Sequence, residues 1–175
     1  MRIPIESSTS YRGRNSRPNL PALALFLVLS FGAGAVGALF SPGFSASAAH
    51  WYAALAKPDW LPPQKWFAPV WTALYGLMAI AAWIIWRERY HRGRTAAITA
   101  YCIQLLLNTL WAPVFFGMKN IDAGLFCIVA VWLAVGWTMR EFARVKPAAA
   151  LILVPYFLWI TFIAAINLAV WKLNP

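Results

Sequence analysis

Five long apolar stretches divide the chain, and a short polar or charged segment separates each stretch from the next. The stretches cover residues 20–40, 68–86, 95–117, 121–142 and 148–171. A helix needs about 20 apolar residues to cross the hydrocarbon core of a bilayer, so each stretch is long enough to span it. The pattern predicts an all-α integral membrane bundle of five transmembrane helices, built as one domain over residues 20–174.

Composition supports a membrane environment. The 175 residues are 62% hydrophobic and only 11% charged, whereas a soluble domain carries about 25% charged residues. The net charge of +10 is typical of nucleic-acid-binding domains when it is concentrated on one face of a soluble fold. Here the basic side chains lie in short segments between apolar stretches, so we predict a lipid bilayer and no nucleic acid as partner.

Basic residues are distributed unevenly among the connecting segments. Residues 1–19 are polar and rich in Arg and Ser, which predicts a disordered basic tail. Eleven of the fifteen basic residues lie in this tail and in the turns after the second and fourth stretches. The positive-inside rule therefore predicts a multi-pass protein with a cytoplasmic N-terminus, and with segment 41–67 and the C-terminus outside.

Segment 41–67 and the stretch after it are unusually rich in Trp and Pro. Six of the eleven Trp residues lie between Trp51 and Trp86. Flat, rigid side chains beside a membrane helix suggest a loop that covers a ligand pocket. We therefore interpret 41–67 as a Trp/Pro-rich lid loop.

Charged groups are absent from the middle of every predicted span. The five acidic residues lie in the tail, in loops or at the ends of spans. Ion-coupled transport normally requires an intramembrane ionisable group, so this class of transporter is disfavoured. The sequence pairs no base with a nucleophile, and its two His and two Cys residues lack the spacing of a metal site. We predict neither a hydrolytic site nor a metal site.

The spans do contain stripes of aromatic and neutral polar residues at helical spacing. The stripes are Trp71, Tyr75, Met78 and Ala82; Gln104, Asn108, Trp111 and Phe115; and Tyr156, Trp159, Ile163 and Asn167. Such stripes also occur at ordinary helix–helix contacts, where Asn and Gln form interhelical hydrogen bonds. Three stripes beside an aromatic loop favour a pocket for a large, flat, apolar ligand.

One pair of small residues suggests self-association. Ala96 and Ala100 are one helical turn apart on the third span. Small residues at this spacing allow two helices to approach closely. This face of the third span is therefore a candidate contact between two copies of the chain.

Three blocks resemble the tryptophan-rich sensory protein/translocator protein (TspO/MBR) family, also called the peripheral-type benzodiazepine receptor family. The blocks are WYAALAKPDWLPPQKWFAPVWTALY, QLLLNTLWAPVFFG and PYFLWITFIAAINLAVWKLN. The resemblance implies a five-helix bundle that is often a homodimer. It also implies binding of porphyrins and other tetrapyrroles, of cholesterol in some members, and of synthetic isoquinoline-type ligands, in a pocket capped by the first loop.

The resemblance assigns pocket residues position by position. It implies pocket aromatics at Trp71 and Trp159, further wall residues at Asn108, Trp111 and Tyr75, and lid residues at Trp51, Trp60, Pro62 and Pro63. Phe115 and Ile163 continue two of the stripes and complete the predicted ligand-binding set.

Two departures bear on sterol binding. Leu168 stands where sterol-binding members carry a Tyr, and Ile163 is bulkier than the small residue that many members have. Both differences weaken the expectation of sterol binding and leave the porphyrin expectation unchanged.

Three functions remain open from the sequence. The first is a receptor or sensor that binds porphyrin as ligand, requires no cofactor, and regulates tetrapyrrole level or a stress response. The second is an enzyme that degrades porphyrin with light or oxygen, with Trp71 and Trp159 as redox partners. The third is a passive porphyrin or sterol transporter.

Overall fold

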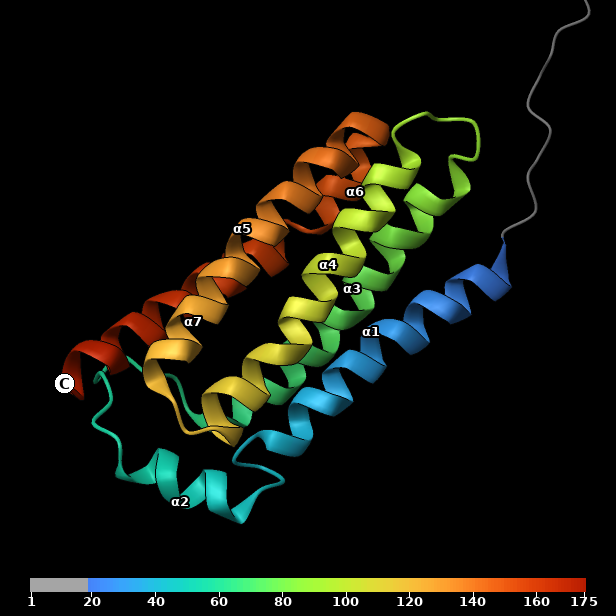
Figure 1. Cartoon of the computed structure of the whole chain (residues 1–175). Helices are drawn as coiled ribbons and strands as arrows, with labels where there is room; N and C mark the ends of the chain where they lie inside the picture. Colours follow the sequence, from blue (N-terminus) through green and yellow to red (C-terminus); the bar gives the residue numbers. More distant parts are fainter. Residues whose placement is uncertain (1–18) are drawn as a thin grey trace, which may run out of the picture.

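The computed structural model describes residues 19–175, and every regular element in that range is a helix. Five helical segments are long and apolar enough to cross a membrane: 20–40, 64–87, 94–117, 121–145 and 147–173. These segments confirm the predicted all-α membrane bundle of five spans (Figure 1). Apart from Asn19, the predicted tail 1–19 lies outside the described residues.

Helix α1 (Leu20–Phe40) begins with a side-chain cap and packs against α3 (Phe67–Arg87) and α4 (Arg94–Ala112). The Oδ1 atom of Asn19 accepts a hydrogen bond of 3.4 Å from the Ala22 amide, and a proline stands in the first turn. Both features are typical of a helix start. Its buried positions recur every three or four residues, at Ala22, Phe26, Ser30 and Ala33.

Helix α5 (Ile121–Val145) packs between α4 and the last span, which consists of α6 (Pro147–Ile152) and α7 (Val154–Leu173). The sequence predicts one helix over 148–171, but the structure interrupts it at Leu153. Pro155 explains the interruption, because a proline nitrogen cannot donate to the carbonyl four residues earlier. Helix α3 contacts both parts of this last span.

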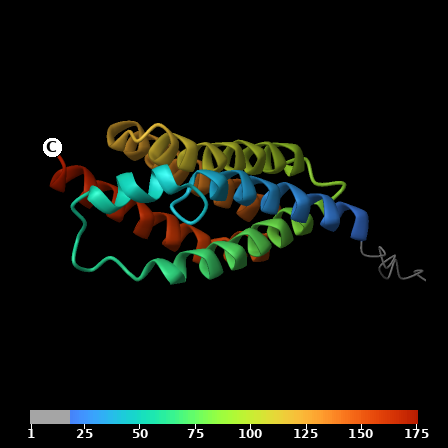
Figure 2. The same ribbon diagram turned by 90° about the horizontal axis from the view of Figure 1, so that it is seen from below.

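The segment over 41–67 is more ordered than a loop. It contains α2 (Ala46–Ala54) and a 3₁₀ turn, η1 (Gln64–Trp66). The Oγ atom of Ser45 accepts a hydrogen bond of 3.2 Å from the Ala48 amide, which caps α2. Alanine favours helix, so a capped run rich in Ala forms a short helix here. Figure 2 shows α2 at the end of the bundle where the chain terminates.

The connecting segments divide between the two ends of the bundle. The start of α1, the α3–α4 turn and the α5–α6 junction lie at one end, and α2 and the C-terminus lie at the other (Figure 1). A salt bridge of 3.2 Å between Lys146 Nζ and Glu88 Oε1 joins the two turns at the first end. We call it the basic end, since the Arg-rich turns meet there. Which side of the membrane it faces stays a prediction.

Helix α1 approaches α3 closely because of one glycine. A Cβ added at Gly34 would lie 2.5 Å from Cε2 of the Tyr75 ring, whereas a Cβ at Gly32 would meet nothing within 4 Å. The Tyr75 ring cannot easily move aside, since its hydroxyl donates a hydrogen bond of 2.8 Å to Asn108.

We therefore expect Gly34→Ala to destabilise the bundle by about 1–3 kcal/mol through overpacking. Gly32→Ala is the matched control and should be neutral or slightly stabilising, because alanine is the better helix former. Thermal unfolding of the purified protein in detergent measures both. Equal melting temperatures for the two variants would contradict the close contact.

Candidate functional site

An aromatic wall forms where α4 runs into a π-helical turn, η2 (Pro113–Gly117). The Met118 amide donates to the Pro113 carbonyl over 2.9 Å, a bond that skips one residue more than an α-helical bond does. Phe115 in this turn is only 3% exposed and stacks on Trp111 with ring centres 5.6 Å apart. Trp51 of α2 meets the Phe115 ring edge-on at 5.5 Å. Three predicted site residues thus come together.

A second aromatic wall is built from α3 and α7. Trp71 stacks on Tyr75 with ring centres 5.6 Å apart, while Trp159 packs edge-on against Phe67 at 5.7 Å. Trp71 and Trp159 therefore each pack against a different aromatic ring and do not stack on each other. Both Trp residues are partly buried against the core.

The lid segment closes over these walls through aromatic contacts and one amide. Trp60 packs against Phe162 of α7 with ring centres 5.9 Å apart. Asn174, just after α7, accepts a 3.0 Å hydrogen bond from the Ala56 amide and donates a 3.0 Å bond to the Ala56 carbonyl. We call this pair of bonds the Asn174 latch. Among the predicted lid residues, Pro62 is half-buried and Pro63 is exposed.

Tyr52 is a site residue that the sequence interpretation missed. Its ring lies edge-on to Phe116 at 5.5 Å and also meets Phe115 at 6.5 Å. Burial raises the pKa of the Tyr52 hydroxyl, and Lys57 Nζ lies 4.8 Å from the centre of its ring. The signal in the sequence was the pair of adjacent aromatics at 51 and 52. It becomes informative only once α2 is known to be a helix.

A chain of buried hydrogen bonds links α3, α4 and α7. Tyr75 Oη donates to Asn108 Oδ1 over 2.8 Å, and Asn108 Nδ2 donates to Tyr156 Oη over 3.0 Å. Tyr156 Oη in turn donates to Gln104 Oε1 over 3.0 Å. We call these four side chains the polar relay. Every one of them is buried, so the relay fixes the walls of the site relative to each other.

Three buried polar atoms have no hydrogen-bond partner among the described residues. They are Trp111 Nε1, Trp159 Nε1 and Asn167 Oδ1. The other amide atom of Asn167 is used, because Nδ2 donates to the Ile163 carbonyl over 2.9 Å. A buried polar group without a partner costs about 1–3 kcal/mol. Trp111 and Trp159 therefore each have an unused hydrogen-bond donor, and Asn167 has an unused acceptor.

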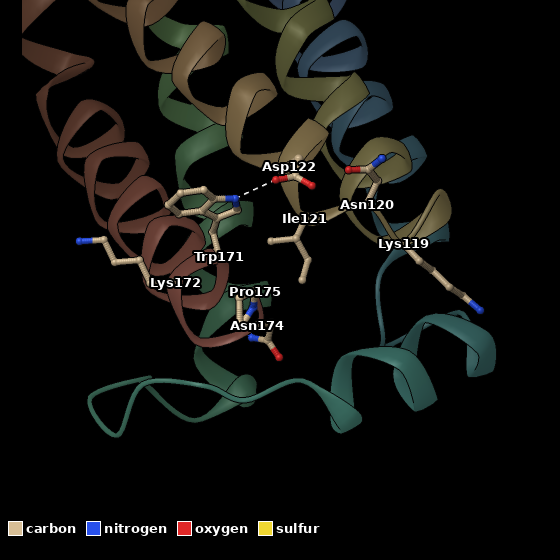
Figure 3. Close-up of a pocket in the computed structure, with 8 residues that line it drawn as sticks. All are labelled: Lys119, Asn120, Ile121, Asp122, Trp171, Lys172, Asn174 and Pro175. Atoms are coloured by element: carbon tan, nitrogen blue, oxygen red, sulfur yellow. Dashed lines mark hydrogen bonds between the residues drawn. The ribbon is translucent and has the colours of Figure 1, made fainter.

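Two hollows on the described part of the chain lie outside the two walls. One, of about 740 Å³, is lined by the α4–α5 connection and the end of α7, with Trp171 Nε1 donating to Asp122 over 2.7 Å at its edge (Figure 3). The other, of about 420 Å³, lies between α1 and α4. Neither is lined by Trp71 or Trp159, because the aromatic side chains of the site pack against each other.

The two positions that bear on sterol binding differ in their exposure. Leu168 is 42% exposed, so the residue that departs from the sterol-binding pattern lies on the outer surface of α7. Ile163, in contrast, is only 2% exposed.

Ala100 is completely buried within the chain while Ala96 is exposed, so only Ala96 of this pair is accessible to a second copy. Among residues 19–175, no three His, Cys, Asp or Glu side chains gather as a metal site would require.

Comparison with known proteins agrees with this architecture. The TspO/MBR family profile matches residues 24–172. Protein CrtK of Rhodobacter capsulatus is 37% identical over 158 residues, which cover 90% of this chain and 95% of that protein. The tryptophan-rich protein TspO of Chlorobaculum tepidum is 38% identical, over 87% of this chain and 96% of its own. The translocator protein of Sus scrofa is 36% identical, over 90% of this chain and 92% of that protein. With a match over most of its length, the chain belongs to the TspO/MBR family.

Proposed function

We propose that this protein is a membrane receptor that binds porphyrins between its two aromatic walls and serves as a sensor of tetrapyrrole level. The unpartnered indole N–H groups of Trp111 and Trp159 carry the proposal, together with the free Oδ1 of Asn167. A ligand that leaves these atoms unpaired gains only stacking energy. A flat ligand with acceptor and donor groups gains hydrogen bonds as well.

A tetrapyrrole has the chemistry that these groups require. Its macrocycle offers a large flat surface for Trp71 and Trp159, and aromatic contacts of this kind contribute about 0.5–1.5 kcal/mol each beyond buried area. Its carboxylates accept hydrogen bonds from indole N–H groups, and its pyrrole N–H groups can donate to an amide oxygen. An aliphatic ligand of the same size lacks both kinds of group.

Binding requires the lid to move. Trp51 fills the space against Phe115, and Trp60 fills the space against Phe162. On this proposal, porphyrin binding displaces these two side chains from their aromatic neighbours, and the Asn174 latch restrains the lid movement that this requires. On this proposal the lid faces the outside of the membrane, as the distribution of basic residues predicts.

A transporter is the second candidate, and the name of one relative favours it. The pig relative is named a translocator protein, whereas a relative from Cereibacter sphaeroides, 39% identical, is named a tryptophan-rich sensory protein. No charged side chain in the described spans lies at mid-membrane, so transport by this chain would be passive. Porphyrin flux into proteoliposomes that exceeds flux into empty vesicles would support this candidate.

Trp159→Phe tests the receptor, because it keeps an aromatic ring and removes the unpartnered N–H together with one ring of the indole. We expect protoporphyrin to bind about 3–10-fold more weakly, which corresponds to one net hydrogen bond of about 0.5–1.5 kcal/mol. The shift of the porphyrin absorbance band on titration measures the affinity. Trp137→Phe is the matched control, since Trp137 is 40% exposed on α5. Equal affinities for the two variants would refute the assigned role of Trp159.

Asn174→Ala tests the role of the lid. Loss of both bonds to Ala56 should speed the dissociation of bound protoporphyrin about fivefold, because each exposed hydrogen bond contributes roughly 0.5 kcal/mol. Stopped-flow absorbance with an excess of competing ligand measures this rate. Lys172→Ala changes an exposed side chain nearby on α7 and should leave it unchanged. An unaltered rate in Asn174→Ala would mean that the latch does not restrain the ligand.

A further inference from the structure

Two arginines at the basic end stack on Trp rings. The Cζ atom of Arg94 lies 4.1 Å from the centre of the Trp86 ring, and that of Arg87 lies 4.8 Å from the centre of the Trp83 ring. Among residues 19–175, neither guanidinium lies within 4.0 Å of a carboxylate, whereas three other basic residues at this end do: Arg140, Arg144 and Lys146. Stacking leaves the edge N–H groups of a guanidinium available to an anion.

The two indoles are themselves fixed by contacts with the start of α1. Trp83 Nε1 donates a 3.1 Å hydrogen bond to the Asn19 carbonyl, and Trp86 meets Phe26 edge-on at 6.0 Å. Phe26 in turn meets the Tyr101 ring at 5.7 Å. The arginines are thus held beside α1, and a continuous series of ring contacts leads from Arg94 to Tyr101.

Tyr101 lines the groove between α1 and α4, and of the α4 residues in this lining it is the nearest in sequence to Arg94. This groove encloses about 420 Å³ and includes Val28, Gly32 and Val36 of α1 and Leu105 and Leu106 of α4. Its hydroxyl groups are already paired: the Tyr101 hydroxyl lies 2.7 Å from Ser30 Oγ, and Thr109 Oγ1 donates to the Leu105 carbonyl over 2.8 Å. The groove therefore offers an occupant an open, mainly apolar surface.

We propose that one anionic glycerophospholipid, from the leaflet at the basic end, binds along this face. Its phosphate contacts Arg94 and Arg87, and one acyl chain lies in the α1/α4 groove. The groove begins at Tyr101, seven residues from Arg94, which is roughly 10 Å along the helix. A lipid has the same arrangement, because its headgroup lies at the interface and its chains extend through about 15 Å of one leaflet.

The charge of this end favours a lipid over a second copy of the chain. An apolar helix from another copy could fill the groove, but it would bring no anion to the two guanidiniums. A free phosphate could satisfy the guanidiniums, but it would leave the groove unused. An anionic lipid matches both parts of the surface.

Native mass spectrometry of the full chain tests the proposal, with equal amounts of phosphatidylglycerol and phosphatidylcholine added to the purified protein. The wild type should retain one phosphatidylglycerol in preference to phosphatidylcholine. Arg94→Gln should reduce this preference about fivefold, the effect of one basic residue near a membrane surface. Arg92→Gln removes the same charge from an exposed position in the same turn and should leave the preference intact.

A second variant tests the groove. Gly32→Leu adds a side chain at the groove, at a position where a Cβ meets nothing within 4 Å. This variant should lose the retained lipid, and Gly76→Leu, which also adds a side chain where nothing lies within 4 Å, should keep it. A melting temperature equal to that of the wild type in lipid-free detergent verifies that each variant folds.

Three results would overturn the proposal. Equal retention of the two lipids by the wild type would show that no anion is selected. Equal effects of Arg94→Gln and Arg92→Gln would show that only the net charge of this end matters. If Gly32→Leu keeps the lipid, the groove does not hold an acyl chain. If this variant instead lowers the mass of the assembly from dimer to monomer, the groove holds a second copy of the chain.

Discussion

In the hydrocarbon region of a bilayer, no water is available to pair a polar side chain, so each such group must find a partner inside the protein. The polar relay meets this constraint for four side chains on three helices. Tyr75, Asn108, Tyr156 and Gln104 each bond across a helix boundary, at 2.8–3.0 Å. Because the alternative is an unpaired group in an apolar medium, the relay sets the relative rotation of α3, α4 and α7.

The same constraint distinguishes the residues that hold the helices together from those proposed to bind a ligand. Relay residues are paired, whereas the indole nitrogens of Trp111 and Trp159 and one amide oxygen of Asn167 have no partner among the described residues. All three belong to the helices that the relay holds in place. The protein thus combines a buried polar network with indole and amide groups that have no partner among the described residues, and on our proposal a bound ligand pairs with them.

The sequence predicts the spans well because the hydrophobic runs are long and the turns between them are charged. Helical spacing also places Trp111 and Phe115 on one face of the third span, and the structure stacks these two rings. The sequence does not predict α2, whose cap and alanines also suit a loop. It also misses the distinct ring partners of Trp71 and Trp159 and the burial of Ala100, because these depend on how the helices rotate against each other.

The central claim is that Trp111 and Trp159 complete their hydrogen bonding with a bound ligand. The indole ¹H–¹⁵N resonances of the ¹⁵N-Trp-labelled protein in detergent report on this directly, once single Trp→Phe variants have assigned them. On addition of protoporphyrin, we predict a downfield shift of the Trp111 and Trp159 indole protons, as expected for a newly formed hydrogen bond, and no such shift for Trp137. Downfield shifts confined to other Trp residues, with Trp111 and Trp159 unchanged at saturation, would contradict the account.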